Sequence, residues 1–139
     1  MDQVLRFAER PDYLKKIRNF IVASLTFDSA NNLAFAGVRH TESAAREMLY
    51  ETDDFEIAVS LRPSGAGTIT LAGQVLSKDS SQIENKSARV DIVDEGDHIA
   101  SCQLSNWGEF VFPDLVRGAY SLQIQLADRV LRINGLATE

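Results

Sequence analysis

Hydrophobic and polar residues alternate along most of the second half of the chain. The clearest run lies between Leu104 and Leu126, where Phe110 and Phe112 share one face and a second run starts at Ala119. This second run places four large side chains on one face: Tyr120, Leu122, Ile124 and Leu126. A period of two residues indicates half-buried antiparallel strands. Asn106-Trp107-Gly108 is a turn signal, and we expect Pro113 and Asp114 to end the first strand, because proline cannot donate to a ladder.

The same period predicts strands upstream and downstream of this run. Phe55–Arg62 and Thr68–Leu76 alternate most regularly, and the remaining candidates are 47–51, 88–93, 98–104 and 130–133. Gly73, inside a strand, predicts a bulge or a close backbone approach. The connections are the loops 63–67 and 77–87 and a hairpin turn at Asp94–Asp97. Eight candidate strands without intervening helices predict a mainly β fold, a two-sheet antiparallel β-sandwich over residues 46–139.

The first 45 residues follow a different pattern, and we expect them to form a helical and extended segment that packs on the sandwich or on a partner. Leu14, Ile17, Phe20 and Ile21 recur at steps of three and four residues, which predicts an amphipathic helix from Tyr13 to about Ile21. From Ile21 the period changes to two, so the helix is expected to give way to a strand that ends at Asp28-Ser29.

Several positions carry a resemblance to a known family. The spacing of Asn106, Gly108, Phe110, Phe112, Leu115, Gly118, Tyr120 and Leu122 resembles the core of carboxypeptidase regulatory-like domains. Gly73-Gln74-Val75 and residues 88–92 are similar to two upstream strands of that family. The resemblance spans roughly Thr68 to Leu136 and implies a transthyretin-like (prealbumin) β-sandwich, an Ig-like architecture. Shorter matches at 25–29, 36–39, 49–51 and 55–57 resemble bacterial proteins related to sigma-factor and anti-sigma regulation.

Composition and charge exclude several classes of function. Of 139 residues, 45% are hydrophobic and 24% are charged, and no apolar run approaches the length of a membrane span. The net charge of −6 argues against nucleic-acid and anionic-membrane binding, because both need a basic surface. A single cysteine, Cys102, cannot form an internal disulfide, so we expect a cytoplasmic protein.

The candidates for chemistry are few. His40 and His98 lack metal-ligand spacing, and residues four apart on a strand lie about 13 Å from each other, too far for a His98–Cys102 pair. The acidic turn Asp94–Asp97 lacks the terminal bidentate acid of a calcium loop. Some prealbumin-type proteins are hydrolases that end in Tyr-Arg-Gly-Ser, and this chain lacks that motif, so the resemblance does not imply hydrolase activity. We therefore predict no catalytic residue, no metal site and no cofactor.

Two hypotheses for the function remain. The first is a non-enzymatic protein-interaction or regulatory module that uses Leu14, Ile17, Phe20, Ile21 and Trp107. Its partner would be a sigma or anti-sigma factor, another effector subunit or a second copy of the chain. The alternative is a carbohydrate- or small-ligand-binding module, in which Trp107 stacks on a sugar beside the Asp94–Asp97 turn.

Overall fold

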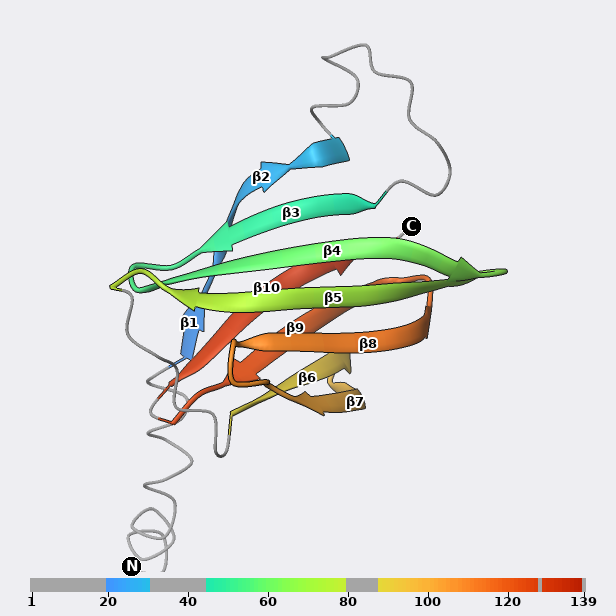
Figure 1. Cartoon of the computed structure of the whole chain (residues 1–139). Helices are drawn as coiled ribbons and strands as arrows, with labels where there is room; N and C mark the ends of the chain where they lie inside the picture. Colours follow the sequence, from blue (N-terminus) through green and yellow to red (C-terminus); the bar gives the residue numbers. More distant parts are fainter. Residues whose placement is uncertain (1–19, 31–44, 80–87, 128, 139) are drawn as a thin grey trace, which may run out of the picture.

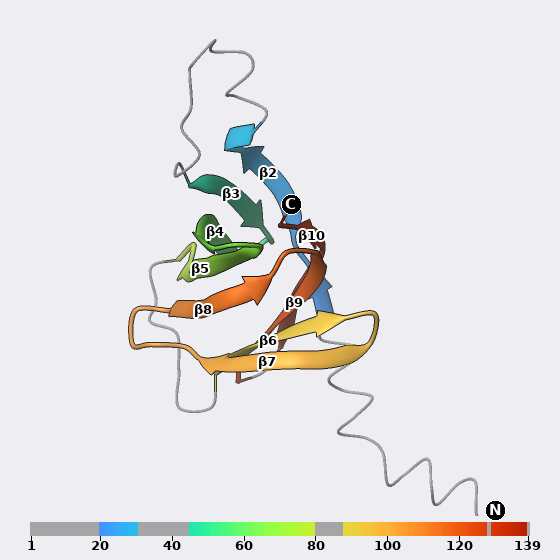
Figure 2. The ribbon, with the colours of Figure 1, turned by 90° about the vertical axis from the view of Figure 1, so that its right-hand side faces the viewer.

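A computed structural model describes residues 20–30, 45–79, 88–127 and 129–138, and every element in these ranges is a β-strand. The strands are β1 (Phe20–Val22), β2 (Ser24–Asp28), β3 (Arg46–Glu51), β4 (Phe55–Gly65), β5 (Thr68–Ser77), β6 (Arg89–Asp94), β7 (Asp97–Gln103), β8 (Glu109–Val116), β9 (Ala119–Gln125) and β10 (Val130–Ala137). They form two five-stranded sheets, sheet A in the order β1-β10-β9-β6-β7 and sheet B in the order β2-β3-β4-β5-β8. The sheets lie face to face as two layers (Figures 1 and 2), which confirms the predicted sandwich.

The core lies between the two layers and is built by the predicted alternation. Sheet B contributes Ile57 and Leu71, and sheet A contributes Ile92, Leu122 and Ile133, all with no exposed surface. Along β4, β5 and β9 these buried residues alternate with more exposed side chains on the outer face, as expected for strands that bury one side.

The amino-terminal strands correct two expectations. Phe20 and Ile21 lie in β1 and not on a helix, while Leu14 and Ile17 lie outside the described residues. β1 pairs with β10 in parallel, so sheet A is mixed and the sandwich is not purely antiparallel. This pairing needs no tight turn, because β1 and β10 come from opposite ends of the described chain. The chain crosses from sheet A to sheet B at Ala23, whose N–H donates to Arg132 O at 2.8 Å.

Strand β8 continues through Pro113 and Asp114 to Val116, although proline was expected to end it. β8 is the edge of sheet B, where a missing N–H can face away from the ladder. The pairing with β5 shifts register between Ile69 and Leu71, and Asp114 has a φ of 57°. An irregular edge strand therefore accommodates the proline.

Two glycines are required by close contacts. A Cβ on Gly73 would lie 2.2 Å from Phe110 Cζ and 2.8 Å from Ala58 O, so the predicted close approach is confirmed. Gly108 has a φ of 78°, and a Cβ there would lie 2.3 Å from Val75 O. Val75 N–H donates to Gly108 O at 2.8 Å, which holds the turn at residues 105–108 against β5.

Candidate functional site

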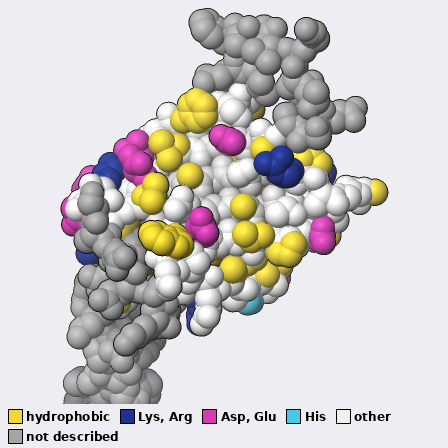
Figure 3. Space-filling model, in the orientation of Figure 1, with side chains coloured by type: hydrophobic (Ala, Val, Ile, Leu, Met, Phe, Trp, Pro, Cys, Tyr) yellow, Lys and Arg dark blue, Asp and Glu magenta, His cyan; other side chains and the backbone are white. Residues whose placement is uncertain are grey.

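The outer face of sheet B carries an open groove of about 600 Å³, which we call the sheet B groove. Its lining comes from all five strands of the sheet: Phe27, Glu47, Met48, Leu49, Ala58, Val59, Ser60, Ala72, Gly73, Gln74, Glu109, Phe110 and Val111. Figure 3 shows this face, on which hydrophobic side chains are spread over the sheet with acidic and basic side chains between them.

The register of the strands explains why the sheet is hollow here. Residues directly opposite each other share a face, and the pairing aligns Leu49 with Ala58 and Ser60 with Ala72. The small side chains of Ala58 and Ser60 on β4 and of Ala72 on β5 therefore lie next to one another on the outer face. Larger ones stand at the edges, where Phe27 pairs with Leu49 and Val111 pairs with Ala72. The groove is the space left above the small residues.

The charged residues that line the groove are both acidic. Glu47 on β3 and Glu109 on β8 stand at its opposite sides, three strand spacings or about 14 Å apart. Both are exposed, and no lysine, arginine or histidine is among the lining residues. An apolar floor between two carboxylates suits an apolar ligand that carries positive charge at its ends.

Trp107 lies next to the Glu109 side of the groove. Gln74, which lines the groove, donates from Nε2 to the Trp107 carbonyl O at 3.0 Å. The Trp107 residue is 72% exposed, and Phe27 and Val111 on the groove itself are 42% and 49% exposed. Exposed apolar side chains that gather into one contiguous patch mark interaction sites. The predicted contact residue Trp107 therefore borders the groove.

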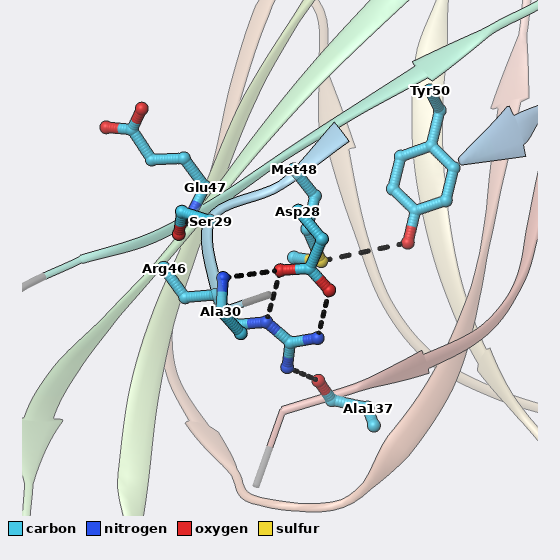
Figure 4. Close-up of polar contacts among 8 residues, drawn as sticks. All are labelled: Asp28, Ser29, Ala30, Arg46, Glu47, Met48, Tyr50 and Ala137. Atoms are coloured by element: carbon cyan, nitrogen blue, oxygen red, sulfur yellow. Dashed lines mark hydrogen bonds and ion pairs between the residues drawn. The ribbon is translucent and has the colours of Figure 1, made fainter. Parts of the chain in front are cut away.

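An ion pair between Asp28 and Arg46 fixes the β2 side of the groove (Figure 4). Arg46 donates from Nε and Nη2 to the two carboxylate oxygens at 3.0 and 2.6 Å, and from Nη1 to Ala137 O at 3.2 Å. The hydrogen bond from Arg46 outweighs burial and lowers the pKa of Asp28 below its ordinary value. This ion pair, which we call the Asp28–Arg46 clasp, connects β2 to β3 and to β10 of the other sheet. Asp28 directly follows the groove residue Phe27.

A second polar cluster surrounds Asp91 on the outer face of sheet A. Asp91 is 3% exposed. Its carboxylate accepts hydrogen bonds from Ser101 Oγ at 2.5 Å, Gln125 Nε2 at 2.6 Å and Arg89 Nε at 3.2 Å. Burial opposes ionisation, but the bonds from Ser101 and Arg89 outweigh it and lower the pKa of Asp91. The cluster joins β6 to both of its neighbours, β7 and β9.

The Asp91 cluster contains a serine and a histidine but lacks the arrangement of a hydrolase triad. His98 Nε2 lies 2.6 Å from Ser101 Oγ, yet the Ser101 hydroxyl proton is donated to Asp91 and not to the histidine. In a triad the acid orients the histidine, and the histidine accepts the serine proton. The geometry therefore favours a structural role for this cluster.

The other predicted candidates are dispersed. Phe20 and Ile21 lie on β1, at the edge of sheet A, and His40 lies outside the described residues. Cys102 Sγ contacts Gln103 O at 3.3 Å, whereas His98 contacts Ser101, so the two do not pair. Trp107 and the Asp94–Asp97 turn lie beyond opposite ends of β7. In the described ranges, no group of three or more His, Cys, Asp or Glu side chains could hold a metal ion.

Sequence reasoning missed the sheet B groove, although part of its signal was visible. Ala58, Ser60 and Ala72 occupy polar-face positions of two predicted strands, where charged or long side chains are common. Their alignment into one hollow depends on the pairing of β4 with β5, which the pattern alone does not specify.

Comparison of the chain with protein-family models, with curated proteins and with solved structures found no match. The described part of the chain also contains no helix long and apolar enough to span a membrane. The structure therefore defines the class, a two-sheet β-sandwich with ten strands in the described residues, and the function has to be argued from its surface.

Proposed function

We propose that this chain is a non-enzymatic protein-binding module whose binding site is the sheet B groove. The observation that carries the proposal is an apolar groove of about 600 Å³ whose charged lining residues are both acidic. Its ligand is a peptide segment with apolar side chains for the floor and lysine or arginine for Glu47 and Glu109. In such a site the apolar contacts supply most of the affinity, and the charges select the partner and its orientation.

The wider setting belongs to the same proposal. The sequence resembles carboxypeptidase regulatory-like sandwiches and, more weakly, bacterial proteins related to sigma-factor and anti-sigma regulation. A cytoplasmic scaffold that holds a regulatory protein by one basic and apolar segment is consistent with both resemblances. A sigma factor, an anti-sigma factor or another effector subunit would supply that segment.

Titration calorimetry with a designed peptide tests the proposal. The peptide carries leucines on one face and lysines at both ends, and its matched control carries glutamate in place of each lysine. We expect the lysine peptide to bind and the glutamate peptide to bind at least tenfold more weakly. Ala72→Arg fills the groove with a long cationic side chain and should abolish binding.

Ala119→Arg is the matched control, because Ala119 is an exposed strand residue of sheet A. It should bind the lysine peptide as the unmodified chain does. Equal binding by Ala72→Arg and Ala119→Arg, or no preference between the two peptides, would refute the groove as the site.

Carbohydrate binding is a second candidate because Trp107 is 72% exposed. A sugar stacked on the indole would change its fluorescence, and Trp107 is the only tryptophan in the chain. Titration with a glycan panel should then give heat and a fluorescence change, both lost in Trp107→Ala. Without either signal the candidate fails.

A further inference from the structure

We propose that the occupant of the sheet B groove is the segment 13–19 of a second copy of this chain, so that the protein self-associates through its binding site. This inference rests on the proposed function, since it names the ligand of the same groove. Three observations support it: the distribution of charge, the size of the groove and the position of β1.

Charge is divided unevenly along the chain. The first 19 residues carry five basic and three acidic side chains, whereas the remaining residues carry nine basic and seventeen acidic ones. Lys15, Lys16 and Arg18 form the densest basic group in the sequence. A basic amino-terminal segment is therefore attracted to the acidic sandwich of another molecule, where Glu47 and Glu109 flank the groove.

The apolar residues of the segment match the floor of the groove. Tyr13, Leu14 and Ile17 lie within the same six residues as Lys15, Lys16 and Arg18. A cavity of about 150 Å³ holds one benzene-sized group, so a groove of about 600 Å³ has room for three such side chains. An apolar stripe such as Leu14 and Ile17 requires a surface that buries it, and the groove would provide that surface.

The position of β1 favours a second copy over the same chain. Ile17 stands three residues before Phe20, so it lies within about 11 Å of the start of β1. β1 belongs to sheet A, and the two sheets are about 10 Å apart. Within sheet B, β4 lies two strands from the edge strand β2, which adds roughly 10 Å.

The groove lies on the outer face of sheet B, whereas β1 belongs to sheet A, the other layer of the sandwich (Figure 2). The three positions that separate Ile17 from Phe20 are therefore too few to span the distance to the groove floor on β4 of the same molecule, whereas the segment of a neighbouring molecule is free of this restriction. Two chains can exchange their segments reciprocally and form a closed dimer.

Sedimentation velocity of the full chain at a series of concentrations tests the inference. We expect a monomer–dimer equilibrium for the unmodified chain. Leu14→Asp combined with Ile17→Asp removes the segment's apolar contacts, and Ala72→Arg blocks the groove, so each variant should be monomeric. An equimolar mixture of the two variants retains one intact segment and one intact groove.

That mixture should form a heterodimer, with an association constant at least tenfold weaker than that of the unmodified dimer. Glu47→Lys combined with Glu109→Lys changes only exposed side chains and should also weaken the dimer at least tenfold. This variant replaces Ala72→Arg in the test if Ala72→Arg disturbs folding. A monomeric unmodified chain, or a mixture that stays monomeric, overturns the inference.

Titration of the Leu14→Asp, Ile17→Asp variant with the lysine peptide separates the two proposals. If the unmodified chain is monomeric and this variant binds the peptide, self-association is wrong and the groove remains a binding site for another protein. If the variant does not bind the peptide, the proposed function falls as well.

Discussion

Ala58 and Ala72 decide whether the outer face of sheet B is hollow or filled. Both lie on central strands, and their neighbours across the ladder are Leu49 and Val111. A long side chain at either alanine would fill the groove between these larger residues. The binding site is therefore set by two small residues, which carry no chemistry of their own.

Gly73 is a residue at which a single added methyl group should destabilise the fold. Gly73→Ala places a Cβ 2.2 Å from Phe110 Cζ and 2.8 Å from the Ala58 carbonyl O. The Phe110 ring is buried, so relief requires a backbone shift, and we expect a loss of about 1–3 kcal/mol in the free energy of unfolding. Urea denaturation measures this loss.

Gly118→Ala is the control, since its nearest neighbour would be Tyr120 Oη at 3.8 Å, an ordinary contact. It should change the stability by no more than about 0.5 kcal/mol. Equal stability of the two variants would show that the Gly73 contact is not a constraint.

At the scale of elements, strand β2 depends on the clasp between Asp28 and Arg46. Asp28→Asn removes the charge from a side chain that is 7% exposed, while its partner Arg46 is 32% exposed. We expect the variant to lose about 1–2 kcal/mol at neutral pH, because a buried charged hydrogen bond is weakened and the partner is partly solvated. The exposed Asp53→Asn is a suitable control and should stay within about 0.5 kcal/mol.

The pH dependence of the same variant follows from the lowered pKa of Asp28. A carboxylate with a folded-state pKa below its unfolded value stabilises the fold above the unfolded value, near 3.8. This stabilisation is lost as the pH falls through the folded-state pKa. The gap between the unmodified chain and Asp28→Asn should therefore close below about pH 4 in urea titrations. A gap that stays constant at acidic pH would contradict this account of the clasp.

Most strands, but not their irregularities, could be predicted from the sequence. Alternation at Phe55–Arg62 and Ala119–Leu126 indicates half-buried strands because each sheet buries one face. Pro113 misled the prediction, since its effect depends on whether the strand lies at an edge, and the edge is set by topology. The same holds for Phe20 and Ile21, whose helical spacing was overridden by pairing with β10.

The candidate site was less predictable than the fold. Trp107 stood out in the sequence because it occupies a turn, and it borders the groove in the structure. The groove itself needs all five strands of sheet B to be in register, so residues between 9 and 39 positions apart must be aligned before the hollow exists. No local pattern contains that information.

At the scale of the whole molecule, the two outer faces of the sandwich differ. Sheet A carries the hydrogen-bonded cluster around Asp91, in which the donors and the acceptor satisfy one another. Sheet B carries an apolar hollow between two exposed carboxylates. The polar cluster of sheet A is therefore satisfied within the chain, and our central claim is that the groove of sheet B is the surface that contacts a partner.

NMR mapping tests this claim most directly. The full chain is titrated with the lysine peptide, and amide shifts are recorded for every strand. We predict that the largest changes fall on the Trp107 indole and on five outer-face residues of the groove: Phe27, Leu49, Ala58, Ala72 and Val111. Asp91, Ser101 and Gln125 on sheet A should stay unchanged. Shifts that concentrate on sheet A, or on β7 alone, would contradict the claim that the sheet B groove is the binding surface.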